Sequence, residues 1–242
     1  MSSLSSCANM CPTTWDGDLN MVKRIYKTGV AHPAVYSDVI MPVLAEMLGP
    51  QHVMIIDGFA GTGKIHDLQD HVDWHVDTIG VELEPEWATL HPQTIVGNAL
   101  DLPFADGWFD ASVTSPCYGN RFADSHVARD DSERRSYTHD IGRQLHDDNS
   151  GKMQWGDQYR DFHAAAWAEA VRVIRPGGRL VLNVSDHIRG GERMMVSSWH
   201  TETLLSLGMS LVDAQHVKTS RMRYGANHRA RVTSELVLAF DK

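Results

Sequence analysis

Residues 53–64, with the sequence VMIIDGFAGTGK, join an apolar run to a loop of small residues. Four apolar residues lead into Asp57, and the loop that follows contains Gly58, Gly61 and Gly63. Because glycine has no side chain, its backbone approaches a ligand closely, and a following helix offers its N-terminal N–H groups. The pattern predicts a buried strand that ends in a ligand-binding loop, although an ordinary tight turn has the same pattern.

Two later apolar stretches also end in residues that could do chemistry. Glu82 ends the stretch TIGVE, and a carboxylate at this place suits a ribose, because it accepts hydrogen bonds from both hydroxyls of the diol. The stretch FDASVT ends directly before the segment Ser115–Tyr118, which reads SPCY. We therefore expect a ligand site at the ends of several strands.

Together, the glycine loop, Glu82 and the SPCY segment resemble the class I S-adenosylmethionine (SAM)-dependent methyltransferases. Within that class they are similar to the DNA amino-methyltransferases, whose catalytic motif reads Ser/Asp/Asn-Pro-Pro-Tyr/Phe. The resemblance extends over most of the chain, from about Gly29 to Phe240. It implies SAM as the cofactor, with the binding residues His32, Asp57, Phe59, Gly61, Gly63, Glu82 and Asn98.

The match to the cofactor-binding pattern has two departures. Gly58 stands where the family's loop usually has proline, and Asn98 stands where aspartate is commoner beside the adenine ring. An amide oxygen still accepts a hydrogen bond from the adenine amino group, and Asp101 is the alternative for that role. His32 begins the sequence HPAVY, which resembles the segment that precedes a helix covering the methionine end of SAM.

The resemblance also implies catalytic roles for the SPCY segment. Ser115 and the Pro116 carbonyl would accept hydrogen bonds from an exocyclic base amine, whose delocalised lone pair makes it a poor nucleophile. Tyr118 would stack on a base taken out of its helix. Catalysis would then depend on positioning and desolvation, with no metal. Serine in the first position most resembles the N4-cytosine branch, ahead of N6-adenine.

Cys117 stands where the family has its second proline, and it leaves a second reaction open. A Pro-Cys pair at this strand end is the nucleophile signature of cytosine-C5 DNA methyltransferases. Those enzymes also use a glutamate after the next strand, where this chain reads LNVSDH, so amino methylation is favoured. An RNA or protein methyltransferase and an inactive SAM-binding protein remain as further alternatives.

Residues 119–157 form a long connection with mixed charge, and we expect a substrate-facing insertion or lid there. A basic stretch near the C-terminus, VKTSRMRYGANHRARV, contains no acidic residue and suits contacts with phosphates. The strand end at Asn183, Asp186 and His187 lies at the edge expected for the active site. The residues expected to contact substrate are Arg121, Trp155, Asp186, Arg221 and Arg223.

The order of elements that must position these residues alternates between strands and helices. Strands are expected at 53–57, 78–82, 93–97, 109–114, 179–185, 210–217 and 234–240. Helices are expected at 33–48, after the glycine loop, from the sequence EPEWATL onward, at 158–174 and at 197–207, with RPGG ending the fourth of these. The alternation predicts an α/β fold, a Rossmann-like seven-stranded methyltransferase sheet closed by a C-terminal antiparallel hairpin.

Composition sets limits on organisation and partners. The chain has 242 residues, 42% of them hydrophobic and 22% charged, so we expect a flexible tail at 1–18 and a single methyltransferase domain at 19–242. A net charge of −9 argues against general coating of nucleic acid but not against a local basic cleft for DNA. Three cysteines without a disulfide framework indicate an intracellular, cytoplasmic protein, and the lack of an apolar run of transmembrane length argues against a membrane partner. From its size, we expect a stand-alone enzyme of a bacterium or a phage-infected cell. A homodimer and a restriction partner are both compatible with the sequence.

Overall fold

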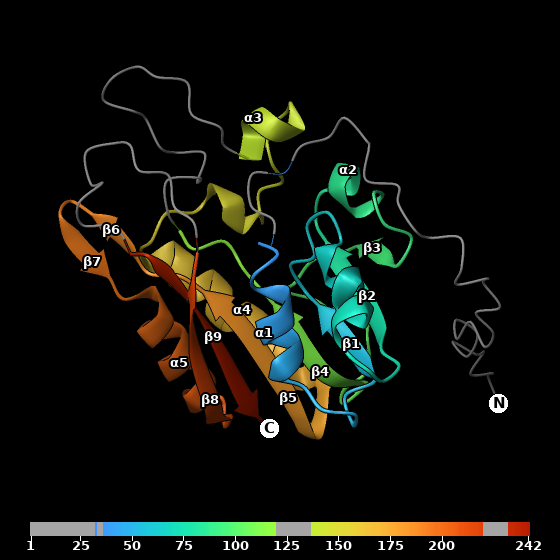
Figure 1. Cartoon of the computed structure of the whole chain (residues 1–242). Coiled ribbons are helices and arrows are strands. Elements are labelled where there is room, and N and C mark those ends of the chain that lie inside the picture. The colour runs from blue at the N-terminus through green and yellow to red at the C-terminus, as the bar shows by residue number, and fades with distance from the viewer. Residues whose placement is uncertain (1–31, 33–35, 120–136, 220–231) are drawn as a thin grey trace, which may run out of the picture.

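The computed structural model describes residue 32 and residues 36–119, 137–219 and 232–242 (Figure 1). The expected tail at 1–18 and the expected substrate contacts Arg121, Arg221 and Arg223 lie outside the described residues. No helix within these ranges is long and apolar enough to cross a lipid bilayer.

A seven-stranded sheet in the order β3-β2-β1-β4-β5-β9-β8 forms the centre of the structure. Strands β1 to β5 are parallel, and β9 is antiparallel to both of its neighbours, β5 and β8. The strands are β1 (Met54–Asp57), β2 (Asp77–Glu82), β3 (Thr94–Val96), β4 (Phe109–Thr114), β5 (Ile174–Val184), β8 (Ser210–Lys218) and β9 (Ser234–Asp241). The expected α/β sheet with a C-terminal antiparallel pair is confirmed.

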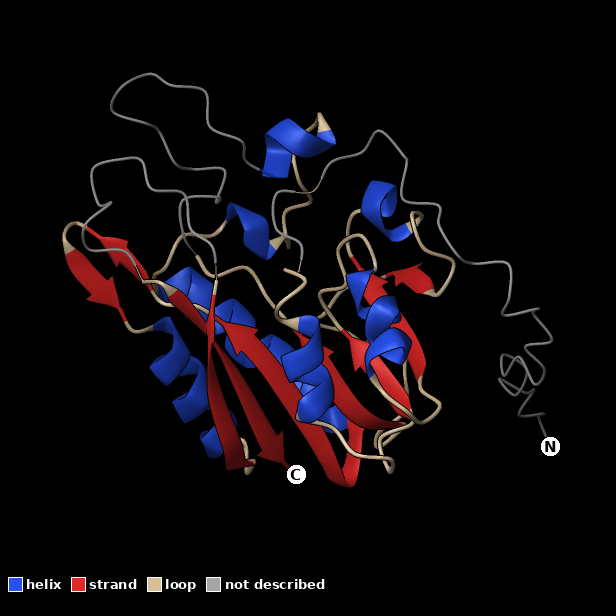
Figure 2. Ribbon diagram, viewed as in Figure 1, coloured by secondary structure: helices blue, strands red, loops and turns tan. Residues whose placement is uncertain are grey.

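Helices cover the two faces of this sheet (Figure 2). Side chains alternate between the faces along each strand, so Val181 and Val237 pack with α1, whereas Leu182 and Leu238 pack with α4 and α5. The helical elements are α1 (Met41–Glu46), η1 (Lys64–His71), α2 (Pro85–Ala88), α3 (Tyr137–Ile141), η2 (Ser150–Lys152), α4 (Asp157–Val173) and α5 (Val196–Ser206). This arrangement buries the central strands on both faces, whereas the edge strand β8 is mostly exposed.

Two helix predictions near the N-terminus differ from the structure. Among the described residues of 33–48, only Met41–Glu46 is α-helical, because Pro42 belongs in the first turn of a helix, where no N–H is needed. The segment after the glycine loop is a 3₁₀-helix, η1, and not an α-helix. The helix expected to begin in EPEWATL is present as α2.

The segment around RPGG also differs from expectation. Helix α4 ends at Val173, and β5 begins at once with Ile174, which pairs with Phe109. The register then shifts before Arg179, so Pro176 lies in an irregular part of the strand, where its missing N–H costs no regular ladder bond. A short hairpin of β6 (His187–Arg189) and β7 (Glu192–Met194) was not predicted.

Apolar residues at i, i+4 spacing in the sequence predict Phe162, Ala166, Ala170 and Ile174 as one face of the helix at 158–174, and the buried face of α4 differs from it. Its buried side chains are Tyr159, His163, Ala166, Trp167, Ala170 and Val173. Phe162 is only partly buried and Ile174 belongs to β5, so the predicted face shared only its two alanines with the observed one. The aromatic and histidine side chains of this face lie directly behind the site described next.

Candidate active site

A cavity of about 860 Å³ opens at the carboxyl ends of the parallel strands. Its lining includes Gly58 after β1, Glu82 at the end of β2, Ser115 after β4 and Asn183 near the end of β5. Because β9 runs antiparallel, its beginning lies at the same edge and brings Glu235 to the cavity. The sheet therefore gathers at one place the strand ends that the sequence singled out.

The glycine loop needs glycine for steric reasons. Gly63 has a φ of 83°, and a β-carbon there would lie 2.7 Å from the β-carbon of His91. A β-carbon on Gly80 of β2 would lie 2.8 Å from the β-carbon of Ala60, so loop and strand pack closely. A β-carbon on Gly61 would lie 3.3 Å from Nε2 of His32, which places that imidazole over the loop. The loop is therefore held between β2, His91 and His32.

Asp57 is buried beneath the loop and does not line the cavity. Its Oδ1 accepts hydrogen bonds from the Phe59 N–H at 2.9 Å and the Thr114 hydroxyl at 2.7 Å, and its Oδ2 accepts one from the Tyr36 hydroxyl at 3.1 Å. Burial raises the pKa of this carboxyl to about 6. Asp57 and Gly63 are therefore not among the lining residues, and Asp57 holds the loop in place through these hydrogen bonds.

Glu82 lines the cavity and is tied to both neighbouring segments. Its Oε2 accepts a hydrogen bond from the Gly61 N–H at 2.9 Å, and its Oε1 accepts one from the Glu84 N–H at 2.8 Å. Burial raises the pKa of this carboxyl to about 7. Since each carboxylate oxygen can accept more than one hydrogen bond, both retain capacity for a diol.

The described end of the insertion closes one side of the cavity, and Glu84 anchors it there. The buried Glu84 carboxylate accepts hydrogen bonds from the His146 N–H and the Asn149 side chain, both at 2.8 Å, and pairs with Arg143. Asp148 accepts a hydrogen bond from the Asn98 side chain at 3.1 Å. Sequence reasoning missed Glu84, although its place two residues after Glu82, at the same strand end, was a usable signal.

Asn98 lies in the cavity wall as expected, but part of its side chain is already engaged. Its Oδ1 accepts a hydrogen bond from the Leu100 N–H at 3.0 Å, so the amide also closes a turn. The alternative residue, Asp101, is exposed and does not line the cavity. Phe59 lines the cavity and also stacks on His163 of α4 at a ring distance of 5.8 Å.

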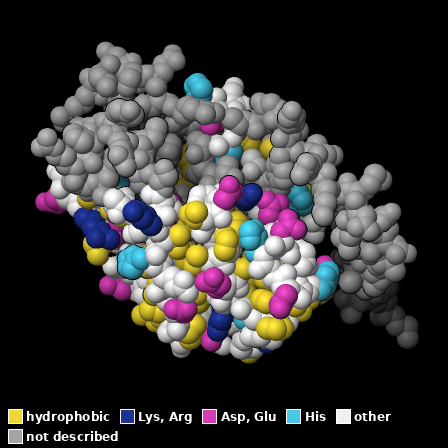
Figure 3. Space-filling view, in the orientation of Figure 1, with side chains coloured by type: hydrophobic (Ala, Val, Ile, Leu, Met, Phe, Trp, Pro, Cys, Tyr) yellow, Lys and Arg dark blue, Asp and Glu magenta, His cyan; other side chains and the backbone are white. Residues whose placement is uncertain are grey.

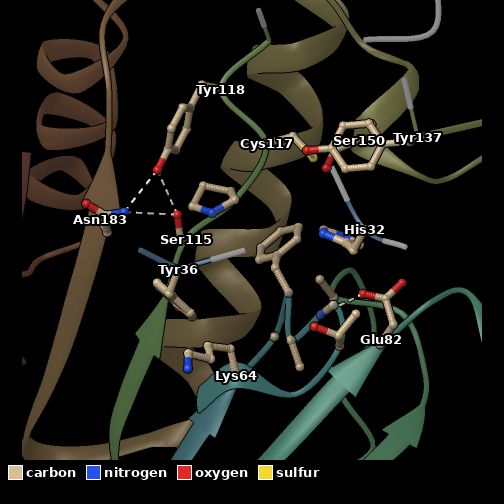
Figure 4. A pocket seen from close by; sticks show the side chains of 18 of the residues that line it. His32, Tyr36, Lys64, Glu82, Ser115, Cys117, Tyr118, Tyr137, Ser150 and Asn183 are labelled. Carbon is tan, nitrogen blue, oxygen red and sulfur yellow. Dashed lines mark hydrogen bonds between the residues drawn. The ribbon is translucent and has the colours of Figure 1, made fainter. Parts of the chain in front are cut away.

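Four side chains from three strand ends form a hydrogen-bonded cluster, which we call the Ser115 cluster: Ser115, Tyr118, Asn183 and Glu235. Figure 4 shows Ser115, Tyr118 and Asn183 pointing toward one another. The hydroxyls of Ser115 and Tyr118 are 2.8 Å apart, and Tyr118 donates to Glu235 at 3.0 Å. The Asn183 amide donates to Ser115, Tyr118 and Glu235 at 3.2, 3.0 and 2.8 Å. The sequence predicted Ser115 and Tyr118 but gave no role to Glu235.

Cys117 points to a different wall of the cavity from Ser115. Its thiol donates to the Tyr137 hydroxyl at 3.2 Å and packs against a cluster that contains Trp87, Tyr137 and Leu145. Figure 4 shows its sulfur beside the Tyr137 ring, away from the Ser115 cluster. The cysteine therefore helps to build the aromatic wall on which His32 also packs.

A buried chain of hydrogen bonds holds the backbone of the SPCY segment from behind. Tyr159 donates to the Cys117 carbonyl at 2.7 Å, and its hydroxyl lies 2.9 Å from Nε2 of His200. Trp167 donates to Nδ1 of His200 at 2.8 Å, so the proton of the neutral imidazole lies on Nε2. Each donor in this chain then has one acceptor, and the Cys117 carbonyl has a fixed position.

The buried histidines predict a loss of stability in acid. Burial lowers the pKa of His163 to about 4, below its unfolded value of about 6.5. The unfolded chain therefore binds the extra proton first, and stability is lost as pH falls below 6.5. His163 alone should contribute a loss of about 2 kcal/mol in the free energy of unfolding between pH 7.5 and 5.

Denaturant unfolding at these two pH values, with a His163→Phe variant alongside, measures this loss. Phenylalanine keeps a ring beside Phe59 but does not titrate. The loss of stability on acidification should be smaller in the variant than in the wild type by about 2 kcal/mol. The raised pKa values of Asp57 and Glu82 act in the opposite direction, but they do so in both proteins and cancel in the comparison. An equal pH dependence in both proteins would contradict a neutral, buried His163.

Two expected substrate residues do not line the cavity. Trp155 packs its ring against Tyr159 and Trp199, with the Arg160 guanidinium above it. Asp186 is buried and accepts hydrogen bonds from the backbone and side chain of Ser197 and from Arg193. Asp186 thus caps the first turn of α5, which explains a conspicuous acid at a strand end without any substrate contact.

The described surface offers little positive charge on the face seen in Figure 3. Asp and Glu side chains are spread between apolar ones, and the described Lys and Arg side chains lie mostly toward one side of that face. Lys218 and Thr219 line the cavity and belong to the predicted basic stretch, most of which lies outside the described residues. The described residues alone therefore identify no extended basic cleft.

Comparison with solved structures identifies the fold. The chain superposes on the [4+2]-cyclase SpnF with a TM-score of 0.52 at 18% identity, covering 84% of this chain and 80% of that one. A SAM-dependent methyltransferase from Methanosarcina mazei gives 0.51 at 13% identity, covering 83% and 97%. Geranyl diphosphate methyltransferase in complex with geranyl diphosphate (GPP) and sinefungin gives 0.50 at 16% identity, covering 84% and 77%.

No protein-family model and no curated protein sequence matches the chain. The structural matches show the Rossmann-like fold of the class I SAM-dependent methyltransferases. Because one of the similar structures is described as a cyclase, the fold by itself does not fix the reaction.

Proposed function

We propose that this protein is a SAM-dependent methyltransferase that acts on an exocyclic amine of a DNA base, with N4 of cytosine favoured over N6 of adenine. The observation that carries the proposal is the position of Ser115. Its hydroxyl lies in the same cavity as the glycine loop and the Glu82 carboxylate, at the adjacent strand end. A cofactor on the loop and a substrate amine at Ser115 would therefore meet inside one cavity.

The residues present fit SAM. The cavity volume of about 860 Å³ is ample for a cofactor of this size. Glu82 can accept from the ribose hydroxyls, the loop backbone at Gly58–Gly61 can contact the methionine part, and Asn98 lies where the adenine would reach. His32 would cover the methionine end, since its imidazole lies over Gly61. When bound, SAM supplies an electrophilic methyl group on a sulfonium.

The catalytic work of the chain itself is to orient and polarise the amine. Ser115 accepts a hydrogen bond from the amine, and the Pro116 carbonyl accepts the other, which favours a tetrahedral nitrogen with an available lone pair. The Tyr118 ring supplies a surface on which a flipped base can stack. The hydrogen bond from Tyr159 to the Cys117 carbonyl holds the backbone of the SPCY segment in place, between the Pro116 carbonyl and Tyr118. No side chain needs to form a covalent bond to the substrate.

The orientation of Cys117 supports amino methylation over cytosine-C5 methylation. A C5 enzyme needs its thiolate against the ring of the target base, whereas this thiol donates to Tyr137 and packs in an apolar cluster. The hydroxyl at Ser115, in contrast, faces the part of the cavity that holds Asn183 and Glu235. We therefore assign Cys117 to the cavity wall.

Transfer of label from methyl-labelled SAM tests the proposal. Parallel incubations contain single-stranded DNA, double-stranded DNA, RNA and a denatured protein extract. Label retained in DNA alone supports the proposal. Label in RNA or protein would show that the protein is a methyltransferase but would contradict DNA as its substrate. If SAM binds but no polymer is labelled, the protein is a SAM-binding protein without activity on these substrates.

SAM binding should strengthen as pH rises, because the ribose diol prefers the ionised form of Glu82. The pKa of this carboxyl is raised to about 7 by burial, so it binds a proton below that pH and accepts hydrogen bonds less well. If the bound form is fully ionised, the dissociation constant should be about tenfold higher at pH 6 than at pH 8.

Calorimetric titration of SAM at both pH values measures this effect, with Glu82→Gln as the control. The amino group of SAM titrates equally with both proteins, so the difference between them isolates Glu82. The Glu82→Gln variant should bind SAM weakly at both pH values. If the dissociation constant of the wild type changes between pH 6 and pH 8 only as much as that of the variant, the proposed contact of Glu82 with the ribose is contradicted.

A further inference from the structure

The Ser115 cluster contains a carboxylate for which the proposed reaction, as described so far, has no use. Glu235 lies at the beginning of β9, and its Oε2 accepts hydrogen bonds from Tyr118 at 3.0 Å and from Asn183 at 2.8 Å. It lines the same cavity as Ser115. A cluster of polar side chains held on two adjacent strands and one strand-end loop is costly to build for structure alone, because each member must be satisfied.

We propose that Glu235 is the final proton acceptor of the methyl transfer, and that the proton reaches it from Ser115 through the hydroxyl of Tyr118. This inference rests on the proposed amine methylation and assigns a further residue to it. Glu235 acts through Tyr118 and is therefore a positioning and proton-accepting residue of the relay, whereas Ser115 touches the amine.

The hydrogen-bond pattern gives the relay a direction. An ionised carboxylate only accepts, so the single proton of the Tyr118 hydroxyl is donated to Glu235. The contact of 2.8 Å between Tyr118 and Ser115 then requires Ser115 to donate to the Tyr118 oxygen. One lone pair of Ser115 accepts from Asn183, and the other remains to accept from an incoming amine, which is the role that the catalytic segment needs.

Asn183 fixes the geometry of the relay without taking part in proton transfer. Its side-chain nitrogen lies within 3.2 Å of the Ser115 hydroxyl, 3.0 Å of the Tyr118 hydroxyl and 2.8 Å of Glu235 Oε2. As an amide it donates hydrogen bonds but does not titrate. Strands β5 and β9 pair directly, with Asn183 opposite Val237, so the donor and the carboxylate are set by the same ladder.

The proton balance of the reaction calls for such an acceptor. The amine nitrogen forms a bond to the methyl carbon, the carbon–sulfur bond breaks, and its electron pair stays on the sulfur of the product thioether. The methylated nitrogen then carries one proton too many. That proton passes to Ser115 as the Ser115 proton passes to Tyr118 and the Tyr118 proton to Glu235, which leaves the carboxyl group neutral until solvent takes the proton.

Single-turnover methylation of the DNA that the wild-type protein methylates tests the relay with three variants. Glu235→Gln keeps the shape and removes the proton acceptor, and Tyr118→Phe keeps the stacking ring and removes the hydroxyl. Each should lower the rate of methyl transfer about 100-fold, the usual size of a lost proton-transfer group. The rate of the double variant should lie within about threefold of the rate of the slower single variant, because both changes interrupt the same proton relay.

Two further readouts separate a relay from a merely structural role. The dissociation constant of SAM should stay within about twofold of wild type in all three variants, since the relay acts on kcat and not on cofactor binding. Glu235→Asp, which restores a carboxylate, should recover at least about tenfold of the rate lost in Glu235→Gln. A Glu235→Gln rate within about threefold of wild type, or losses that multiply in the double variant, would overturn the relay.

Failure of the relay and failure of the proposed function give different results. If the wild-type protein methylates base amines and Glu235→Gln does so equally well, only the relay is wrong. If the wild-type protein labels no base amine in any nucleic acid, the proposed substrate and the relay that serves it are both wrong.

Discussion

Replacing Ser115 with alanine should lower the single-turnover rate of methyl transfer about 100- to 1000-fold, while SAM still binds. The hydroxyl is the acceptor that the amine meets in the cavity, and it is also the first group of the chain that leads to Tyr118 and Glu235. Alanine removes both functions and leaves the fold intact, since Ser115 is only partly buried. Rapid-quench measurement of labelled methyl transfer, with enzyme in excess over DNA, gives the rate directly.

Ser185→Ala is the matched control for this variant. Ser185 directly follows β5, and its hydroxyl lies 3.0 Å from the Asp186 carbonyl oxygen and 3.4 Å from that of Ser234, outside the cavity lining. Its loss should leave the transfer rate within about threefold of wild type, because no group of the reaction contacts it. A Ser115→Ala rate equal to that of the control would contradict the catalytic assignment of the whole segment.

Replacing Asp57 with alanine should destabilise the protein by about 3 kcal/mol and weaken SAM binding at least about tenfold. The carboxylate accepts from Tyr36, Thr114 and the Phe59 N–H, so its removal leaves three donors without an acceptor in a buried place. The Phe59 N–H belongs to the loop on which the cofactor would lie, so loss of stability and loss of affinity have one cause. Denaturant unfolding and calorimetric titration of SAM measure the two effects.

Asp110→Ala separates these two effects. Asp110 also holds backbone, since it accepts from the N–H groups of Val53 and Met54 and pairs with Arg175. It lies near the beginning of β4, at the edge of the sheet opposite the cavity. This variant should lose stability but bind SAM as wild type does. Equal SAM affinity in wild type and in folded Asp57→Ala would contradict the placement of the cofactor on the loop.

The sequence predicted the sheet well because its signals there are local and strong. Buried parallel strands are short apolar runs, and β1 and β2 end in the residues that the pattern singled out, whereas β4 ends directly before Ser115. The predicted helix at 33–48 was too long because helical spacing of apolar residues also fits a turn that packs on the core. The strand at RPGG was placed too late because proline and glycine usually end elements, whereas here they form an irregular part of β5.

The sequence predicted the cavity residues that lie in motifs or at the ends of parallel strands, such as Glu82 and Ser115, but not Glu235. Ser115 and Tyr118 are three residues apart, but Glu235 is 117 residues away from Tyr118, and the pairing of β5 with β9 brings it there. Asp186 is not among the lining residues and accepts from Ser197, because an acid at a strand end can cap a helix as readily as it contacts a substrate. The direction in which a side chain points could not be predicted from the sequence either, and only the structure shows that Cys117 faces Tyr137.

Mass spectrometry of nucleosides from DNA incubated with the protein and methyl-labelled SAM tests the central claim most directly, with Cys117→Ser alongside. The account predicts labelled N4-methylcytosine, or N6-methyladenine, formed by both the wild type and the variant, because the Cys117 thiol belongs to the cavity wall. Labelled 5-methylcytosine that disappears in Cys117→Ser would contradict it and would establish covalent catalysis by the cysteine.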